Sequence, residues 1–264
     1  MRPVCIPARP SQLIHRLAKP IAALCVLMAV SFAYGQDRDR TPPMLADDEI
    51  EMIKVYEVDL SADPPPRIAI PRDKLRDFLK EFQQDDRIPR GKTNQEKWLR
   101  ADGHVHLRLL FDLKARDYYK HVRVKSQNPA LREWGNIHRR HILGYFQPTF
   151  GAGQVEGLYL FPRHRDSERV EMTNYYILTQ ATINGVPLID RNQPEESLLV
   201  QWGLPRASAK FPAPEVEGWE PKYKDMKDER FIAHVDWIKS LFPGNQGSNL
   251  GVNYKLPGQK KPEN

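Results

Sequence analysis

The segment Leu188–Pro214, LIDRNQPEESLLVQWGLPRASAKFPAP, decides the fold because it combines a helix start, a short apolar helix and an abrupt stop. Pro194 suits a first helical position, and the two glutamates after it would oppose the positive end of the helix dipole. We expect Gly203 to end this helix in a left-handed conformation and Pro205 to prevent its continuation. Its buried face would consist of Leu198, Leu199 and Trp202.

The first 35 residues have the features of a secretory signal peptide. Basic residues precede an apolar run at residues 21–32, and Ala33 and Gly35 supply small residues where a signal peptidase cuts. The apolar run is shorter than the roughly 20 residues of a membrane-spanning helix. We therefore expect cleavage near Gly35, export to the periplasm or the extracellular space, and no stable transmembrane anchor. An uncleaved anchor is the alternative.

The predicted leader also holds both cysteines and most of the charge imbalance. The chain has 40 Lys and Arg against 34 Asp and Glu, and the leader contains four basic residues and no acidic one. The remainder is nearly neutral, which does not favour nucleic acid or an anionic membrane as a partner. Because Cys5 and Cys25 leave with the leader, the mature chain cannot form disulfides, thiolate metal sites, a cysteine nucleophile or thioether-attached haem.

Apolar residues at helical spacing predict a mainly α-helical chain with a few short strands. Beyond the first segment, the expected helices cover residues 47–56, 71–82, 107–111, 128–145 and 228–242. Short strands are expected at 67–70 and 122–125, and a tight turn at 184–185. Residues 158–161 fit a strand or an extended link, and 173–180 fit either element type. Pro148 and its neighbouring glycines indicate a loop at 144–157.

The sharpest polar pattern is the pair His138 and His141, one helical turn apart beside Trp134. Such a pair can hold zinc or another divalent ion if further ligands arrive from elsewhere. The candidates nearest in sequence are His104, His106 and His121, the first two of which we expect in a loop that leads into a helix. The favoured alternative is one packed histidine and one hydrogen-bonded histidine, because no third ligand is specified and HExxH is absent. No nucleophile elbow occurs, so a serine hydrolase is not predicted.

Residues 192–221, followed by DERFIAHVDWIKSLF at 228–242, resemble the C-terminal half of a cytochrome c-type domain. Over Leu45–Phe242 the chain resembles exported planctomycete-type proteins that contain a cytochrome c-like domain. The matching short motifs lie at 48–57, 67–71, 115–119, 173–178 and 187–190. The resemblance implies a cytochrome c-like helical domain at 127–243, an N-terminal, mostly helical extension at 36–126, and a flexible or draped tail at 244–264.

Both haem contacts of that family are missing from this chain. The family's haem loop carries two cysteines and a histidine, whereas residues 143–158 contain neither residue type. Where a P-H-P motif would offer a second ligand, this chain has Ala213 between two prolines. The resemblance therefore implies an exported, haem-free, non-catalytic structural or interaction module without a cofactor, beside an exported or membrane-associated redox protein. The alternative is a redox protein that binds haem or a divalent metal noncovalently through His138 and His141.

Overall fold

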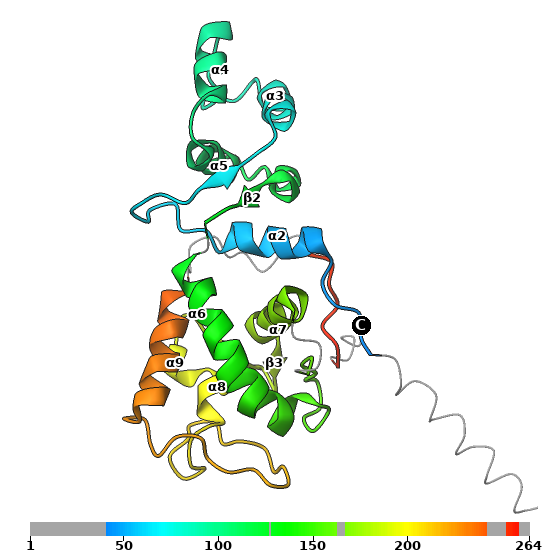
Figure 1. Ribbon diagram of the computed structural model, residues 1–264, viewed down its shortest axis with the longest axis vertical. Helices are drawn as coiled ribbons and strands as arrows, with labels where there is room; N and C mark the ends of the chain where they lie inside the picture. The colour runs from blue at the N-terminus through cyan, green and yellow to red at the C-terminus, as the bar shows by residue number, and fades with distance from the viewer. Residues whose placement is uncertain (1–40, 127, 163–166, 242–251, 259–264) are drawn as a thin grey trace, which may run out of the picture. The chain divides into compact units, whose positions relative to one another are not determined.

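The computed structural model of the chain describes residues 41–126, 128–162, 167–241 and 252–258. The predicted leader and both cysteines lie outside these residues. The chain divides into two units, Met1–Pro43 and Met44–Asn264, and every helix and strand given below belongs to the second unit (Figure 1).

Helix α2 (Asp47–Tyr56) has the bounds that the sequence predicts. Its acidic first turn opposes the helix dipole, and the Glu49 carboxylate accepts a hydrogen bond of 2.9 Å from the Ala46 amide. Ile50 and Ile53 are buried on its inner face. Helix α2 therefore supplies one layer of the core, and it contacts elements that come both early and late in the chain.

Three α-helices and a short 3₁₀ segment follow α2. They are α3 (Arg72–Glu81), α4 (Lys92–Leu99), α5 (Gly103–Asp112) and η1 (Arg116–His121). Helices α3 and α5 were expected, but α4 was not, because only Trp98 and Leu99 of its residues pack on the core. His104 and His106 lie within α5, so the expected loop at this position was wrong.

The described residues contain two antiparallel pairs of short strands. Strand β1 (Ile68–Ala69) pairs with β2 (Arg123–Val124), and both lie where the sequence predicts short strands. Strand β3 (Thr182–Ile183) pairs with β4 (Val186–Pro187) across Asn184 and Gly185. These two residues have φ angles of 52° and 80°, as a type I′ hairpin turn requires.

Helix α6 (Pro129–Ile137) starts as predicted, because the Asn128 side chain accepts a hydrogen bond from the Ala130 amide. The loop expected at 144–157 was wrong over its first half. Helix α6 runs directly into η2 (His138–Gly151), a π-helix that contains Pro148. The aromatic residues Phe146 and Phe150 are buried in η2, and their packing outweighs the cost of the proline and the glycines.

Residues 173–180, for which the sequence left helix and strand open, belong to helix α7 (Glu168–Gln180). The Ser167 hydroxyl caps it by accepting a hydrogen bond from the Val170 amide. Nearly all of its last three turns is buried, so its sequence lacks the amphipathic pattern of a surface helix. Residues 158–161 form an extended link with one isolated bridge, Ala152 to Tyr159.

The segment Leu188–Pro214 forms two short elements instead of one helix. The 3₁₀ turn η4 (Pro194–Glu196) and helix α8 (Leu198–Gln201) meet at Ser197, whose backbone is extended. The three predicted apolar residues of this segment are buried. The Gln201 side chain accepts hydrogen bonds from the amides of Lys210 and Phe211, and so holds the proline-rich loop against α8.

Gly203 does not adopt the expected left-handed conformation. A glycine is required here because a Cβ at this position would lie only 2.3 Å from the Tyr223 ring. The Gly203 carbonyl also accepts hydrogen bonds from the amides of Lys222 and Tyr223, at 2.8 and 2.9 Å. The glycine thus fixes the position of Tyr223.

Helix α9 (Glu229–Ser240) packs beside α6, as Figure 1 shows. The Asp228 side chain caps it, and the helix ends two residues before the predicted position at Phe242, which lies outside the described residues. Trp237 of α9 stacks on Trp134 of α6 with ring centroids 5.4 Å apart.

In the tail, residues 252–258 include three partly buried apolar side chains that pack on the core. The prediction of a mainly α fold is confirmed. Within the described ranges, no helix is long and apolar enough to cross a membrane.

Candidate functional site

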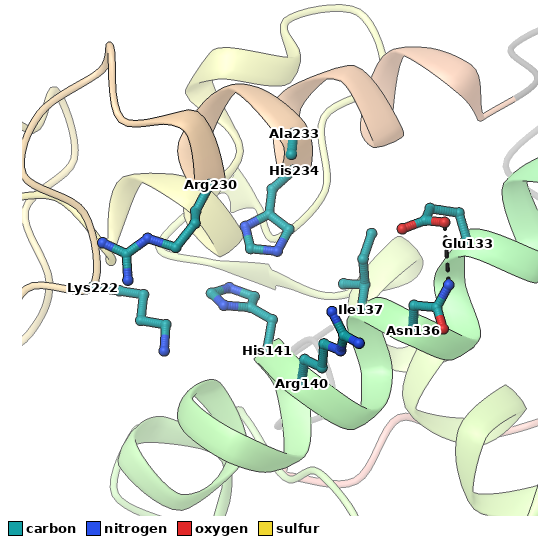
Figure 2. Close-up of a pocket in the computed structure, with 9 residues that line it drawn as sticks. All are labelled: Glu133, Asn136, Ile137, Arg140, His141, Lys222, Arg230, Ala233 and His234. Carbon is teal, nitrogen blue, oxygen red and sulfur yellow. Dashed lines mark hydrogen bonds between the residues drawn. The ribbon is translucent and has the colours of Figure 1, made fainter.

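A pocket of about 390 Å³ is lined by α6, the start of η2, the segment before α9 and α9 itself (Figure 2). Two histidines, His141 from η2 and His234 from α9, form part of its wall, and their rings point toward one another. The charged side chains that line it are Glu133, Arg140, Lys222 and Arg230. The pocket therefore combines two imidazoles with three cations and one carboxylate.

The imidazoles are joined through a tyrosine. The ring centroids of His141 and His234 are 4.2 Å apart. The Tyr223 hydroxyl lies 2.8 Å from His234 Nδ1 and 3.4 Å from His141 Nε2. A hydroxyl can donate to one imidazole nitrogen and accept from an N–H of the other. This arrangement suits two uncharged rings in complementary tautomers.

Burial and neighbouring cations keep both rings uncharged. Burial, followed by the nearby His234 and Lys222, holds the pKa of His141 well below its usual value. Burial, with Lys222 and Arg230, lowers the pKa of His234 to about 4, against a partial opposing effect of Asp228. Burial also raises the pKa of the Tyr223 hydroxyl, so this group keeps its proton. At neutral pH the charge of the pocket therefore comes from its Arg, Lys and Glu side chains alone.

The fold brings these groups together through the segment Leu188–Pro214 and the loop that follows it. Tyr223 lies over Gly203, just after α8, and its position determines where its hydroxyl meets the two rings. The hydroxyl of Tyr145 lies 3.2 Å from the carbonyls of Trp202 and Glu220, which ties η2 to the same loop. Each imidazole thus comes from a different helix, and the loop residues hold the bridge between them.

His138 and His141 both lie in η2, but their rings contact different parts of the structure, although both were predicted on one face. The His138 ring contacts α7, where its Nε2 lies 3.0 Å from the Asn174 side-chain amide. The Asn174 amide also bonds the Phe161 main chain. Because a π-helix has a wider turn than an α-helix, residues three apart in η2 do not share a face. His138 therefore belongs to an internal hydrogen-bonded network, and His141 belongs to the pocket.

The other predicted ligands lie on separate elements. His104 and His106 are in α5, where His106 Nε2 lies 2.7 Å from the Trp98 carbonyl, and His121 ends η1. Over the described ranges, no three His, Cys, Asp or Glu side chains are placed to hold one metal ion. His141 and His234 form a close pair of imidazoles, with ring centroids 4.2 Å apart.

His234 was not predicted as a site residue, although the sequence contains a signal for it. In α9 the residues Phe231, His234, Val235 and Ile238 follow the i, i+3, i+4, i+7 spacing of one helix face. His234 is the polar member of an otherwise apolar stripe. A polar residue at such a position needs a buried partner, and here that partner is Tyr223.

The three cationic side chains of the pocket differ in the interactions that they make with the rest of the protein. Arg230 forms hydrogen bonds to both carboxylate oxygens of Asp228, at 3.1 and 2.8 Å. The Lys222 ammonium lies 5.5 Å from the centroid of the Tyr145 ring. Arg140 is exposed and has no ion-pair or hydrogen-bond partner among the described residues. Arg140 and Lys222 are therefore available to an anion in the pocket.

We expect His234 to make the stability of the protein depend on pH. Its folded-state pKa of about 4 lies below the ordinary value of 6.5, so between these values the unfolded chain binds a proton that the folded chain does not. The resulting stability is complete above pH 6.5 and is lost as the pH falls toward 4. Between about pH 7.5 and pH 5, His234 alone should contribute a loss of about 2 kcal/mol.

Urea denaturation at both pH values checks this effect in the wild type, in His234→Gln, and in His104→Gln as a control outside the pocket. The pH-dependent loss should shrink in His234→Gln and persist in His104→Gln. Equal pH dependence in all three proteins would contradict the assignment of an uncharged His234.

No protein-family model, curated protein or solved structure matches this chain.

Proposed function

We propose that the protein is an exported, non-catalytic structural or interaction module, built on a cytochrome c-like helical scaffold that does not carry haem. In this proposal it works beside an exported or membrane-associated redox protein. The observation that supports it most is the packing of the segment where the resemblance places a haem loop. Phe146 and Phe150 of that segment are fully buried and pack on Trp202, with ring centroids 5.7 and 4.9 Å apart.

The second half of this support concerns the residue that replaces the expected ligand histidine. Ala213 is 4 % exposed and belongs to the hydrophobic core. A small apolar side chain at this position contributes to packing and offers no metal ligand. Ala213 and the two phenylalanines of the expected haem-loop segment are thus apolar and packed against their neighbours, which suits a scaffold that stabilises itself without a prosthetic group.

The rival proposal is a metal or noncovalent haem site on His138 and His141. The contacts of the two rings give it less support, because His138 contacts Asn174 and His141 contacts Tyr223 and His234. A variant of it that uses His141 and His234 has the closer ring pair. It would place a metal cation beside Arg140 and Lys222, which repel it electrostatically.

Absorbance spectroscopy and elemental analysis of the purified exported protein distinguish these proposals. The protein should be produced in a host that supplies haem and transition metals during export. We expect no Soret band and no metal near one equivalent. A Soret band, or one equivalent of metal that is lost in His138→Ala or His141→Ala, would overturn the haem-free proposal.

An alanine at His234 serves as the matched variant for this experiment. If one equivalent of metal binds and is lost in His141→Ala and His234→Ala but kept in His138→Ala, the site is the pocket and the sequence-based pair is wrong. If metal is lost in His138→Ala and His141→Ala but kept in His234→Ala, the predicted pair is right.

A further inference from the structure

We propose that the pocket between α6 and α9 binds a small organic anion, a molecule that carries a phosphate or carboxylate group. This proposal goes beyond the haem-free module, since it assigns a ligand class to a site that such a module does not require. It is based on the charge of the lining, on an arginine in it that has no partner among the described residues, and on the pocket volume.

The lining is positively charged and its cations come from three parts of the chain. Arg140 lies in η2, Lys222 in the loop that follows Gly203, and Arg230 in the first turn of α9. Glu133 is the one carboxylate in the lining, and it accepts a hydrogen bond of 3.3 Å from Asn136 (Figure 2). A guanidinium group presents paired N–H donors that match the geometry of carboxylate and phosphate oxygens. Arg140 is free to make such a contact.

The two imidazoles in the wall carry no charge and interact with the protein itself. The His141 ring is 1 % exposed and interacts with the Leu199 main chain and, through Nε2, with the Tyr223 hydroxyl at 3.4 Å. His234 Nδ1 lies 2.8 Å from the same hydroxyl. The charge of a bound anion would therefore be balanced by the cationic side chains of the lining.

The volume of the pocket favours an organic anion over a simple inorganic one. A water molecule occupies about 30 Å³ in the liquid, so about a dozen would fill a pocket of about 390 Å³. An inorganic phosphate ion would occupy only a small part of that space. The apolar atoms of Ile137 and Ala233, which also line the pocket, can contact the carbon skeleton of a larger ligand.

Calorimetric titration of the exported protein with four probes tests the proposal. The probes are glycerol 3-phosphate, succinate, inorganic phosphate and, as an uncharged control, glycerol. We expect saturable binding of glycerol 3-phosphate or succinate that is tighter than binding of inorganic phosphate, and no binding of glycerol. The tighter of the two organic probes identifies the head group as a phosphate ester or a carboxylate. Added NaCl should weaken binding, because the pocket is open to solvent.

Arg140→Gln should weaken the binding of the better probe about tenfold, which is the expected effect of losing one charge-assisted hydrogen bond. Lys222→Gln should also weaken it, and gives a second test from another part of the chain. Arg132→Gln is the matched control, because Arg132 lies on the exposed surface of α6 and does not line the pocket.

Three results would overturn the proposal. They are the absence of saturable binding by all anions, equal binding of glycerol, and an equal loss of affinity in Arg132→Gln and Arg140→Gln. The last would show that the anion responds to the general surface charge. The titration is separate from the haem and metal measurements, so failure of one proposal does not imply failure of the other.

Discussion

Replacement of Arg191 with methionine is expected to lower the free energy of unfolding by about 3–5 kcal/mol. Arg191 donates two hydrogen bonds, of 2.7 and 3.1 Å, to the carboxylate of Glu57, which is 2 % exposed. Its guanidinium group also lies 3.4 Å from the Tyr175 hydroxyl. Without Arg191 the buried carboxylate would lose its counter-charge, and that cost far exceeds the loss of an exposed ion pair.

Two further variants separate the buried ion pair from other effects in urea denaturation. The double variant Glu57→Leu with Arg191→Met should recover most of the loss, since an apolar pair of similar volume can replace a buried ion pair at little cost. Arg169→Met removes the exposed pair with Asp47 and should cost less than about 1 kcal/mol. If Arg191→Met costs no more than Arg169→Met, the Glu57–Arg191 pair does not stabilise the fold.

The Glu57–Arg191 ion pair connects the end of α2 with the segment that leads to the candidate site. Glu57 follows α2, and its main-chain carbonyl accepts a hydrogen bond from the side chain of Asn128, the N-cap of α6. Arg191 belongs to the segment that leads to Gly203 and Tyr223. Glu57 therefore contacts the start of α6, which runs into η2 with Arg140, and its ion pair with Arg191 contacts the segment that leads to Tyr223.

Local sequence rules predicted the elements whose causes are local. Examples are helix α2 with its acidic start, the start of α6 at Asn128, and the turn at Asn184 and Gly185. Each depends on residues within a few positions of one another, so the sequence alone states both the cause and the result. The mainly α fold follows from the sum of such signals.

Structural features that depend on contacts between residues far apart in the sequence were not predicted, or were predicted wrongly. The π-helix η2 passes through Pro148 because Phe146 and Phe150 find an aromatic partner in Trp202, more than 50 positions away. The reason for a glycine at position 203 was predicted wrongly. The Tyr223 ring that excludes a Cβ there lies in a separate part of the sequence, so local rules could not identify it.

The candidate site was predicted only in part for the same reason. His141 was identified, but its pairing with His138 assumed α-helical geometry, which the π-helix does not have. The actual neighbours of His141, Tyr223 and His234, come from a loop and a helix more than 80 positions later. Only the polar interruption in the apolar stripe of α9 marked His234 in the sequence.

Replacement of Trp134 with alanine is expected to cost about 3–5 kcal/mol in the free energy of unfolding, the usual range for an aromatic residue removed from a core. Trp134 is fully buried, and its ring centroid lies 5.4 Å from those of both Trp237 and Tyr175. Its indole N–H donates a hydrogen bond of 3.2 Å to the Glu171 carbonyl. The alanine variant would lose these contacts and leave a cavity between α6, α7 and α9.

The same variant should also weaken anion binding in the pocket, because α6 and α9 form both the walls of the pocket and the two sides of the tryptophan stack. Trp134→Phe keeps an aromatic ring against Trp237 and should retain most of the stability and affinity. Trp219→Ala, at a partly exposed ring outside this stack, is the control for general loss of an aromatic residue. Denaturation and titration of all three variants decide the matter. If Trp134→Ala loses stability but keeps full affinity, the spacing of α6 and α9 does not depend on the stack, and the pocket is held instead by Tyr223 and its loop.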